Sequence, residues 1–321
     1  MSVSAIPGAF TRQESVFRDR VCADRSTEFP AASGRYHLYV SMACPWSHRT
    51  VIVRRLKGLE DAISISYAHP YRDERGWAFP GGEYADELNG FAYLAEAYER
   101  TRPGYDGRVT VPVLWDRETG RIVCNESAEI IRMFGREFDA FAGDPGLDLY
   151  PEDLRAEIDE LNAWTYSEVN NGVYRAGFAR SQAAYDDAFE RLFTALSRLE
   201  TLLGERRYLA GDRLTEADWR VFPTLARFDA VYYVHFRCNG RRLVDHPNLW
   251  AYARELYQRP GVAETVRFDE IKEHYYTTHD ELNPKRIVPL GPLDQDWWEA
   301  PARAGSSSRA LASPSSSERS R

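Results

Sequence analysis

The residue with the clearest chemical potential in this sequence is Cys44, because it stands between an apolar strand pattern and a helix pattern. It lies in the run YVSMACPWSHRT, residues 39–50. Pro45 suits the first position of a helix, where its missing N–H costs nothing and its φ angle is already helical. Cys44 is therefore predicted at a helix N-terminus, where unpaired N–H groups and the helix dipole stabilise an anion. We interpret Cys44 as a candidate nucleophile that reacts as a thiolate.

The position at which a dithiol redox enzyme carries its second cysteine is occupied here by Ser47. No disulfide can form across this turn, so the thiol that resolves an oxidised Cys44 must come from another molecule. A small cytosolic thiol, with glutathione as the obvious candidate, would react with Cys44 through a mixed disulfide. The alternative interpretation is an inert, buried cysteine that precedes a helix.

The bulk properties of the chain restrict its class. With 321 residues, about two domains are expected. The formal net charge of -8 argues against nucleic acid or an anionic membrane as the main partner. We find neither a stretch apolar enough to span a bilayer nor a signal-peptide pattern, and we expect a cytoplasmic protein. The four cysteines have no disulfide-framework or metal-ligand spacing, so no metal is expected.

Residues 35–136 are predicted to form one α/β domain, after an N-terminal extension over residues 1–34. Alternating apolar residues, turn residues and helical periodicity predict the following elements in order: a strand at 36–40, a helix, a strand at 62–66, a helix from 83 to about 98, a hairpin of 109–115 with 121–124, and a helix at 127–134. This order fits a thioredoxin-like domain. In that fold a proline that begins the third strand faces the active cysteine and is often cis, and Pro112 occupies this place.

The second half of the chain has helical periodicity. After a linker over residues 137–150, an all-helical domain is predicted over 151–300, with helices at 152–169, 185–203, 216–233 and 249–257. Thr215 and Asp218 have the spacing of a capping box. The Ala-, Ser- and Arg-rich composition of residues 301–321 predicts a disordered tail.

A thioredoxin-like domain followed by an all-helical domain resembles the glutathione transferase architecture. The run CPWSHR at 44–49 resembles the CPWAHR signature of the glutathionyl-hydroquinone reductases, the Xi class of that superfamily. Five further segments agree with this class: RVTVPVLWD at 108–116, NES at 125–127, NNGVY at 170–174, RFDAVY at 227–232 and IKEHYY at 271–276. Ser47 and Cys124 depart from the family pattern, but neither is the nucleophile.

A glutathione site needs partners for two carboxylates, an ammonium group and a peptide backbone. Glu126 and Ser127 open a predicted helix, so the N–H and hydroxyl of Ser127 can hold the γ-glutamyl carboxylate while Glu126 takes the ammonium. The alternative is that Asn125 or Ser127 simply caps this helix. The resemblance implies three further glutathione contacts: the backbone of Val111 and the side chains of Trp77 and Arg108. Taken alone, Trp77 would more often be a core residue and Arg108 a solvated charge.

The resemblance also implies that Tyr174, Tyr232 and Tyr275 surround an aromatic substrate. A phenol can donate a hydrogen bond to a substrate oxygen and pack against an aromatic face. Because the chain has nineteen tyrosines, these roles depend on the resemblance. His48 and Arg49 either add positive potential near Cys44 or form a solvated helix face. We do not expect His48 to act as a general base, since a helix-stabilised thiolate needs none.

The resemblance implies that this enzyme reduces glutathionyl-hydroquinones to hydroquinones. Cys44 would take the glutathionyl group as a mixed disulfide, and a second glutathione would release it as oxidised glutathione. A homodimer is also implied. The alternatives are an omega-like thioltransferase or dehydroascorbate reductase, and a non-catalytic ligand-binding protein with the transferase fold. A conventional conjugating transferase is disfavoured, because it would carry Ser or Tyr in place of Cys44.

Overall fold

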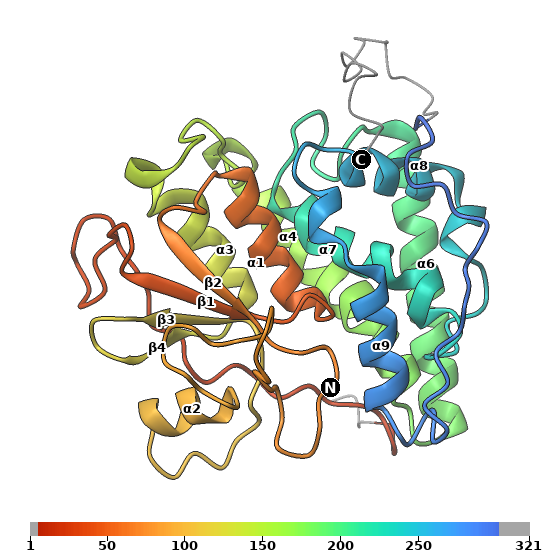
Figure 1. The fold of residues 1–321 in the computed structure, drawn as a ribbon. Coiled ribbons are helices and arrows are strands. Elements are labelled where there is room, and N and C mark those ends of the chain that lie inside the picture. Colours follow the sequence, from red (N-terminus) through yellow and green to blue (C-terminus); the bar gives the residue numbers. More distant parts are fainter. Residues whose placement is uncertain (1–5, 302–321) are drawn as a thin grey trace, which may run out of the picture.

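The computed structural model describes residues 6–301, so the predicted tail, apart from its first residue, lies outside the described residues. Two parts of the chain lie side by side: a small mixed sheet with its helices, and a group of helices formed by the second half of the sequence (Figure 1). This arrangement confirms the predicted thioredoxin-like and all-helical architecture.

The sheet has four strands in the order β2-β1-β3-β4. These strands are β1 (Tyr36–Val40), β2 (Ile63–Tyr67), β3 (Val113–Asp116) and β4 (Arg121–Cys124). β1 pairs parallel with β2 and antiparallel with β3, which continues antiparallel into β4. All five residues of β1 are buried, as expected for a strand in the middle of a sheet that is covered on both faces.

The helices α1 (Pro45–Leu56) and α3 (Ser127–Arg136) pack together on one face of this sheet, and α2 (Ala95–Thr101) lies on the other side (Figure 1). The helix predicted from residue 83 is wrong over most of its length, because regular helix begins only at Ala95. The carboxylate of Asp86 accepts the N–H of Phe91 at 3.0 Å and the hydroxyl of Tyr39 at 3.1 Å. These bonds hold the preceding residues in a loop, since a side-chain acceptor competes with helical hydrogen bonds.

The second half is formed by α4 (Arg155–Thr165), α5 (Gly172–Gly177), α6 (Gln182–Glu205), α7 (Glu216–Arg227), α8 (Pro247–Tyr257) and α9 (Phe268–Thr278). The helices predicted at 152–169 and 216–233 each end in a π-helical segment, Tyr166–Asn170 and Phe228–Tyr232. The predicted capping box is confirmed, because Asp218 accepts the N–H of Thr215 at 2.8 Å. Helix α9 was missed by the periodicity analysis.

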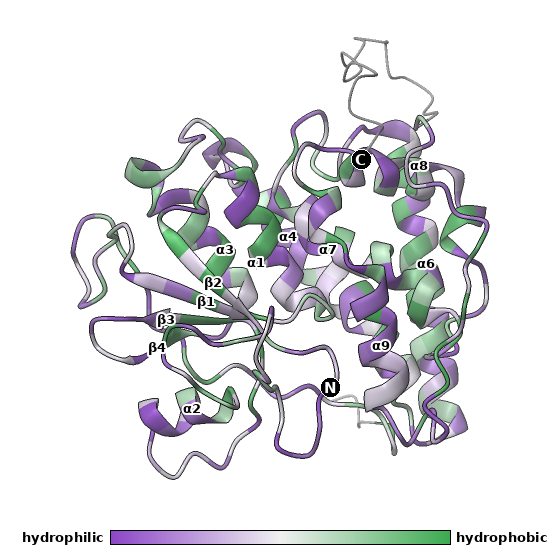
Figure 2. Cartoon of the chain, viewed as in Figure 1, coloured by the Kyte–Doolittle hydropathy of each residue, from purple (hydrophilic) through white to green (hydrophobic). Residues whose placement is uncertain are grey.

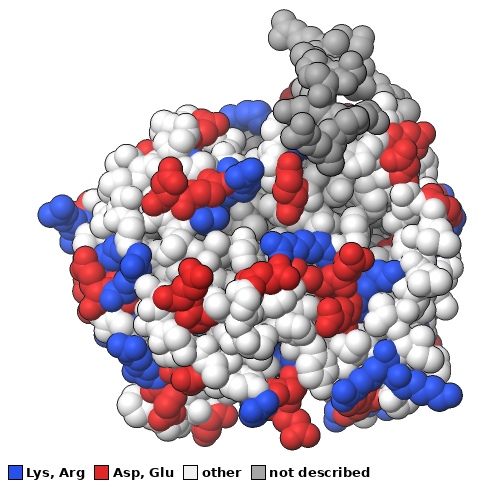
Figure 3. All heavy atoms as spheres, viewed as in Figure 1, with Lys and Arg blue, Asp and Glu red and all other residues white. Residues whose placement is uncertain are grey.

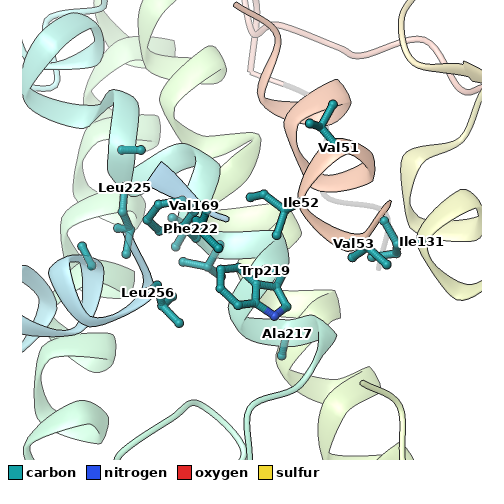
Figure 4. Close-up of a cluster of buried hydrophobic side chains, with 14 of the residues drawn as sticks. Val51, Ile52, Val53, Ile131, Val169, Ala217, Trp219, Phe222, Leu225 and Leu256 are labelled. Carbon is teal, nitrogen blue, oxygen red and sulfur yellow. The ribbon is translucent and has the colours of Figure 1, made fainter. Parts of the chain in front are cut away.

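The two halves share one hydrophobic core, with α1 at its centre. Figure 4 shows Ile52 of α1 directed toward Trp219 of α7, while Val53 lies beside Ile131 of α3. Ile52, Val53 and Trp219 have no exposed surface. Because α1 is packed from both sides, its N-terminus has a fixed position relative to both halves.

The helices carry hydrophilic bands (Figure 2), and one face of the molecule carries charges of both signs (Figure 3). Along α6 hydrophobic and hydrophilic bands alternate (Figure 2), and its apolar residues are buried at helical spacing. On the face shown in Figure 3, acidic and basic side chains are interspersed rather than gathered by sign. No helix within residues 6–301 is long and apolar enough to cross a lipid bilayer.

Candidate active site

Cys44 lies where the sequence predicted it, at the N-cap of α1 with Pro45 at the first helical position. Its backbone is extended (φ −80°, ψ 124°), and its carbonyl accepts the N–H of His48 at 3.0 Å. The thiol makes no capping bond with the helix and lies 3.7 Å from the carbonyl oxygen of Val111. The Val111–Pro112 peptide is cis, as predicted. The sulfur therefore lies close to the helix N-terminus and to the carbonyl oxygen of Val111.

Cys44 lines a cavity of about 760 Å³ that both halves of the molecule enclose. This volume is in the range of small-molecule sites. The cavity brings together six of the predicted site residues: Cys44, Trp77, Arg108, Val111, Tyr174 and Tyr275. The first four come from the thioredoxin-like half, and the two tyrosines come from α5 and α9. A ligand that contacts Cys44 is thus bounded by both halves.

Glu126 and Ser127 begin α3 as predicted, but neither belongs to the cavity lining. The carboxylate of Glu126 accepts the N–H of Ala128 at 3.0 Å and the hydroxyl of Ser15 at 2.9 Å. Glu126 is therefore the capping residue, and the alternative that Asn125 or Ser127 caps the helix is wrong. If the ammonium group of glutathione binds Glu126, it must share the carboxylate with the N–H of Ala128 and the hydroxyl of Ser15.

Asn125 instead connects the N-terminal segment to the site. Its side-chain oxygen accepts the N–H of Phe17 at 3.1 Å, and its amide donates to the hydroxyls of Tyr98 and Thr110 at 3.1 and 3.2 Å. Because Thr110 lines the cavity and directly precedes Val111, these bonds help to hold the loop that faces Cys44.

The three predicted tyrosines form a hydrogen-bonded chain. The hydroxyl oxygens of Tyr174 and Tyr275 are 2.6 Å apart, and those of Tyr275 and Tyr232 are 3.1 Å apart. Tyr174 and Tyr275 line the cavity, whereas Tyr232 is fully buried behind them and is not part of the lining. Burial raises the pKa of Tyr174 and raises those of Tyr232 and Tyr275 well above 10. All three phenols therefore keep their protons at neutral pH and serve as hydrogen-bond donors.

Trp77 is both a core residue and a cavity residue. It is 5% exposed and stacks on His274 of α9, with ring centroids 5.0 Å apart. Burial lowers the pKa of His274 to about 3 and that of His279 to about 2. Both imidazoles are consequently neutral at physiological pH. Sequence reasoning missed both histidines, although the segment at 271–276 contains His274.

The interpretation of His48 and Arg49 as a solvated helix face is wrong, because both side chains are buried. Nε2 of His48 lies 2.8 Å from Oγ1 of Thr265. Burial and the charge of Arg227 lower the pKa of His48 well below its usual value. Arg49 donates to Oδ1 of Asn170 at 2.9 Å. The two residues thus join α1 to the helical half instead of facing water.

Arg227 contacts the turn that precedes Cys44, which sequence reasoning did not predict. From the last turn of α7 it donates to the carbonyls of Ala43 and Met42 at 2.9 and 2.8 Å, and its Nη1 donates to the carbonyl of Pro223 at 2.9 Å. The guanidinium has no exposed surface. Because Met42 and Ala43 directly precede Cys44, Arg227 fixes the turn that carries the thiol.

The other cysteines do not share the environment of Cys44. All four are free thiols, and Cys44 is the one that lines the cavity. Burial raises the pKa of Cys124 and of Cys238, so these thiols resist ionisation at neutral pH. Within residues 6–301 no group of His, Cys, Asp or Glu side chains has an arrangement that would hold a metal ion.

A thioredoxin-like sheet with a cysteine at the first helix N-terminus, packed against a helical half, defines a glutathione transferase-like protein. The chain belongs to the glutathione S-transferase family, since residues 43–137 match the model of the glutathione S-transferase N-terminal domain and residues 182–255 match that of the C-terminal domain.

Full-length relatives agree with this membership. The chain is 51% identical to glutathionyl-hydroquinone reductase YqjG of Escherichia coli K12, covering 89% of each protein. It is 50% identical to glutathionyl-hydroquinone reductase PcpF of Sphingobium chlorophenolicum, covering 89% of this chain and 90% of the relative.

Solved structures show the same relationship. The glutathione-bound structure of YqjG superposes with a TM-score of 0.86 at 51% identity, over 90% of this chain and 96% of that one. The Xi glutathione transferase of Phanerochaete chrysosporium also gives 0.86, at 48% identity over 89% and 98% of the two chains. The resemblance to the Xi class that was inferred from the sequence is thereby confirmed.

Proposed function

We propose that this protein is a glutathione-dependent oxidoreductase that reduces glutathionyl-hydroquinones to hydroquinones. The observation that carries the proposal is a single cavity bounded by the Cys44 thiol and by two hydrogen-bonded phenols, Tyr174 and Tyr275. A thiol nucleophile and a proton-donating aromatic wall are what this reaction requires. The names of the relatives YqjG and PcpF support the same activity.

In this proposal glutathione binds along the thioredoxin-like side of the cavity. The backbone of Val111 pairs with the cysteinyl residue, while Trp77 and Arg108 contact the remainder of the tripeptide. We place the γ-glutamyl group toward the N-terminus of α3, beyond the cavity lining, where the helix N-terminus favours a carboxylate and Glu126 and Ser127 are its nearest partners. The glutathione-bound structure of YqjG supports glutathione as the co-substrate.

The first chemical step transfers the glutathionyl group to Cys44. The thiolate attacks the thioether sulfur, an S–S bond forms, and the electron pair of the S–C bond goes to the ring carbon, which takes up a proton. Carbon is a poor leaving group, so the phenols of Tyr174 and Tyr275 must donate to the ring oxygen and supply that proton. Tyr232 supports them from behind through its bond to Tyr275. The hydroquinone then leaves.

The second step regenerates the enzyme. The thiolate of a second glutathione attacks the mixed disulfide, oxidised glutathione departs, and Cys44 leaves as a thiolate that the helix N-terminus stabilises. As the resemblance implies, we also propose a homodimer that works in the cytoplasm. Analytical ultracentrifugation of the full chain would test the dimer, and a monomer at micromolar concentration would contradict it.

Replacing Cys44 with Ser tests the mechanism. We expect Cys44→Ser to lose hydroquinone release, because an alcohol forms no mixed disulfide, while the nearly isosteric change leaves the fold intact. Intact-protein mass spectrometry after exposure to a glutathionyl-hydroquinone without free glutathione should show one glutathionyl group on the native protein and none on the variant. An adduct on Cys22, Cys124 or Cys238 would show that another cysteine is the nucleophile.

A thioltransferase or dehydroascorbate reductase is the second candidate, since it would use the same thiol. This candidate is supported by relatives that are named omega-like, such as one from Schizosaccharomyces pombe at 45% identity. Rates on a glutathionyl-hydroquinone, a glutathione mixed disulfide and dehydroascorbate should be measured side by side. Turnover of the last two without the first would reject the main proposal.

A further inference from the structure

The N-terminal segment before β1 reaches the cavity and forms part of its wall. Residues 8–13 line the cavity together with residues of both halves. The carbonyl of Gly8 accepts the N–H of Arg180 at 2.9 Å, and that of Pro7 accepts the hydroxyl of Ser181 at 2.7 Å. Gly8 has φ +83°, and a Cβ atom there would lie 3.1 Å from the backbone of Arg180. The segment thus packs closely against the helical half.

Arg12 is the residue that this segment brings to the aromatic wall. Its Nε donates to Oδ1 of Asn171 at 2.6 Å, which orients the guanidinium. The guanidinium carbon lies 4.5 Å from the centre of the Tyr174 ring and 4.9 Å from that of Trp46. Its charge opposes the effect of burial on Tyr174 by lowering the pKa of that phenol. Arg12 is therefore held beside one of the proposed proton donors.

The hydrogen-bonding capacity of Arg12 is not used up by the protein. Among residues 6–301 no carboxylate forms an ion pair with Arg12, and its Nη2 atom is buried without a hydrogen-bond partner. A buried donor of a charged group that lacks an acceptor is costly, and it can be satisfied by water, by an ion or, where it faces a cavity, by a ligand. Because Arg12 lines the cavity, a bound substrate is in place to supply it.

We propose that Arg12 binds a negatively charged oxygen on the aromatic group of the substrate. This inference rests on the proposed function. The contacts of Arg12 with Tyr174 and Trp46 place its guanidinium beside aromatic residues of the cavity, where its charge also acts on Arg108. A guanidinium forms strong, charge-assisted hydrogen bonds with an anionic oxygen. That oxygen is either a ring hydroxyl, which every hydroquinone carries and whose anionic form the guanidinium favours, or a carboxylate carried by particular hydroquinones.

The test compares Arg12→Gln and Arg12→Lys with the native protein on three substrates. These are an unsubstituted glutathionyl-hydroquinone, its ring-carboxylated analogue, and a glutathione mixed disulfide without an aromatic group. Arg18→Gln is the matched control, because Arg18 lies in the same segment, outside the cavity, in an exposed ion pair with Glu129. Such a surface pair contributes little, so the control should retain its rates within about twofold.

We expect Arg12→Gln to lower kcat/KM on an aromatic substrate by about 10²- to 10³-fold, the range for losing one donor to an oxyanion. Arg12→Lys should recover part of this loss, and reduction of the mixed disulfide should be unchanged, which also shows that the variants fold. Equal losses on both aromatic substrates would assign the ring hydroxyl. A loss confined to the carboxylated one would assign the carboxylate.

Two results would overturn the inference. Parallel loss of aromatic and disulfide activity would make Arg12 a structural or glutathione-binding residue, and unchanged aromatic activity would remove it from the site. Absence of aromatic turnover by the native protein would be a different failure, because it would reject the proposed function itself. The same set of rates therefore distinguishes failure of the Arg12 inference from failure of the proposed function.

Discussion

At the scale of single residues, the proposed reaction divides the work between a thiol and a set of phenols. Cys44 is positioned by a local feature, the N-terminus of α1, whereas each tyrosine is positioned by its buried neighbours. Tyr275 is the central phenol, since its hydroxyl is bonded to those of Tyr174 and Tyr232. Losing Tyr275 should therefore disturb the proton supply more than losing either partner.

Replacing Tyr275 with Phe tests this division. We expect turnover of glutathionyl-hydroquinones to fall by about one to three orders of magnitude, the range for losing a general acid or oxyanion donor. Tyr232→Phe, behind the cavity wall, should have a smaller effect. Reduction of a simple mixed disulfide should change little in both variants, because a thiolate leaves without help. Parallel losses in both reactions would mean that the tyrosines serve packing or glutathione binding.

At the scale of elements, the position of the thiol depends on α7 as much as on α1. The buried guanidinium of Arg227 donates to the two carbonyls before Cys44, so the helical half holds the turn of the other half that carries this thiol. The positive N-terminal end of α1 can stabilise a thiolate only if the thiol stays at that end of the helix. Arg227 is accordingly a positioning residue.

Arg227→Met should reduce kcat for aromatic and disulfide substrates alike, because it releases the turn that carries the thiol. It also leaves carbonyls unpaired, at about 1–3 kcal/mol each, which urea unfolding would report. The matched control is Arg54→Met, since Arg54 is a buried arginine near the other end of α1 that donates to the carbonyl of Ile63 at 2.7 Å. The control should lose stability while keeping kcat. Equal loss of kcat in the two variants would remove the positioning role.

At the scale of the whole molecule, burial of histidines makes stability depend on pH. Burial lowers the pKa of His37 and of His235 to about 4, and that of His274 to about 3. In an unfolded chain a histidine titrates near 6.5. Between pH 6.5 and 4 the unfolded state therefore binds protons that the native state does not, and the free energy of unfolding falls as the pH is lowered.

His37→Asn tests the contribution of one buried histidine outside the cavity to the pH dependence of the unfolding free energy. His37 lies on β1, with its Nδ1 2.7 Å from Oγ of Ser64. Removing it should reduce the pH dependence of the unfolding free energy by up to about 1.4 kcal/mol per pH unit between pH 6 and 4. Urea unfolding across this range would measure the change. An unaltered slope would show that His37 is not neutral in the folded protein.

Much of the fold was predictable because its signals are local. Alternation located β1 and β4, and helical periodicity located most of α6 and α8. The errors have tertiary causes. A loop stands where a helix was expected after residue 83. The carboxylate of Asp86 holds this loop by accepting hydrogen bonds from the nearby N–H of Phe91 and from the distant hydroxyl of Tyr39.

By itself, the sequence determined the location of Cys44 at a helix N-terminus and the opening of α3. Pro45 restricts its own φ angle, and strand and helix periods are read within a few residues, so Cys44 and Ser127 could be placed without any long-range information. Tertiary structure alone decided that Arg227 reaches the Cys44 turn, that His48 and Arg49 are buried, and that Arg12 joins the tyrosines. These contacts join residues more than a hundred positions apart, and no local conformational preference encodes such a distance.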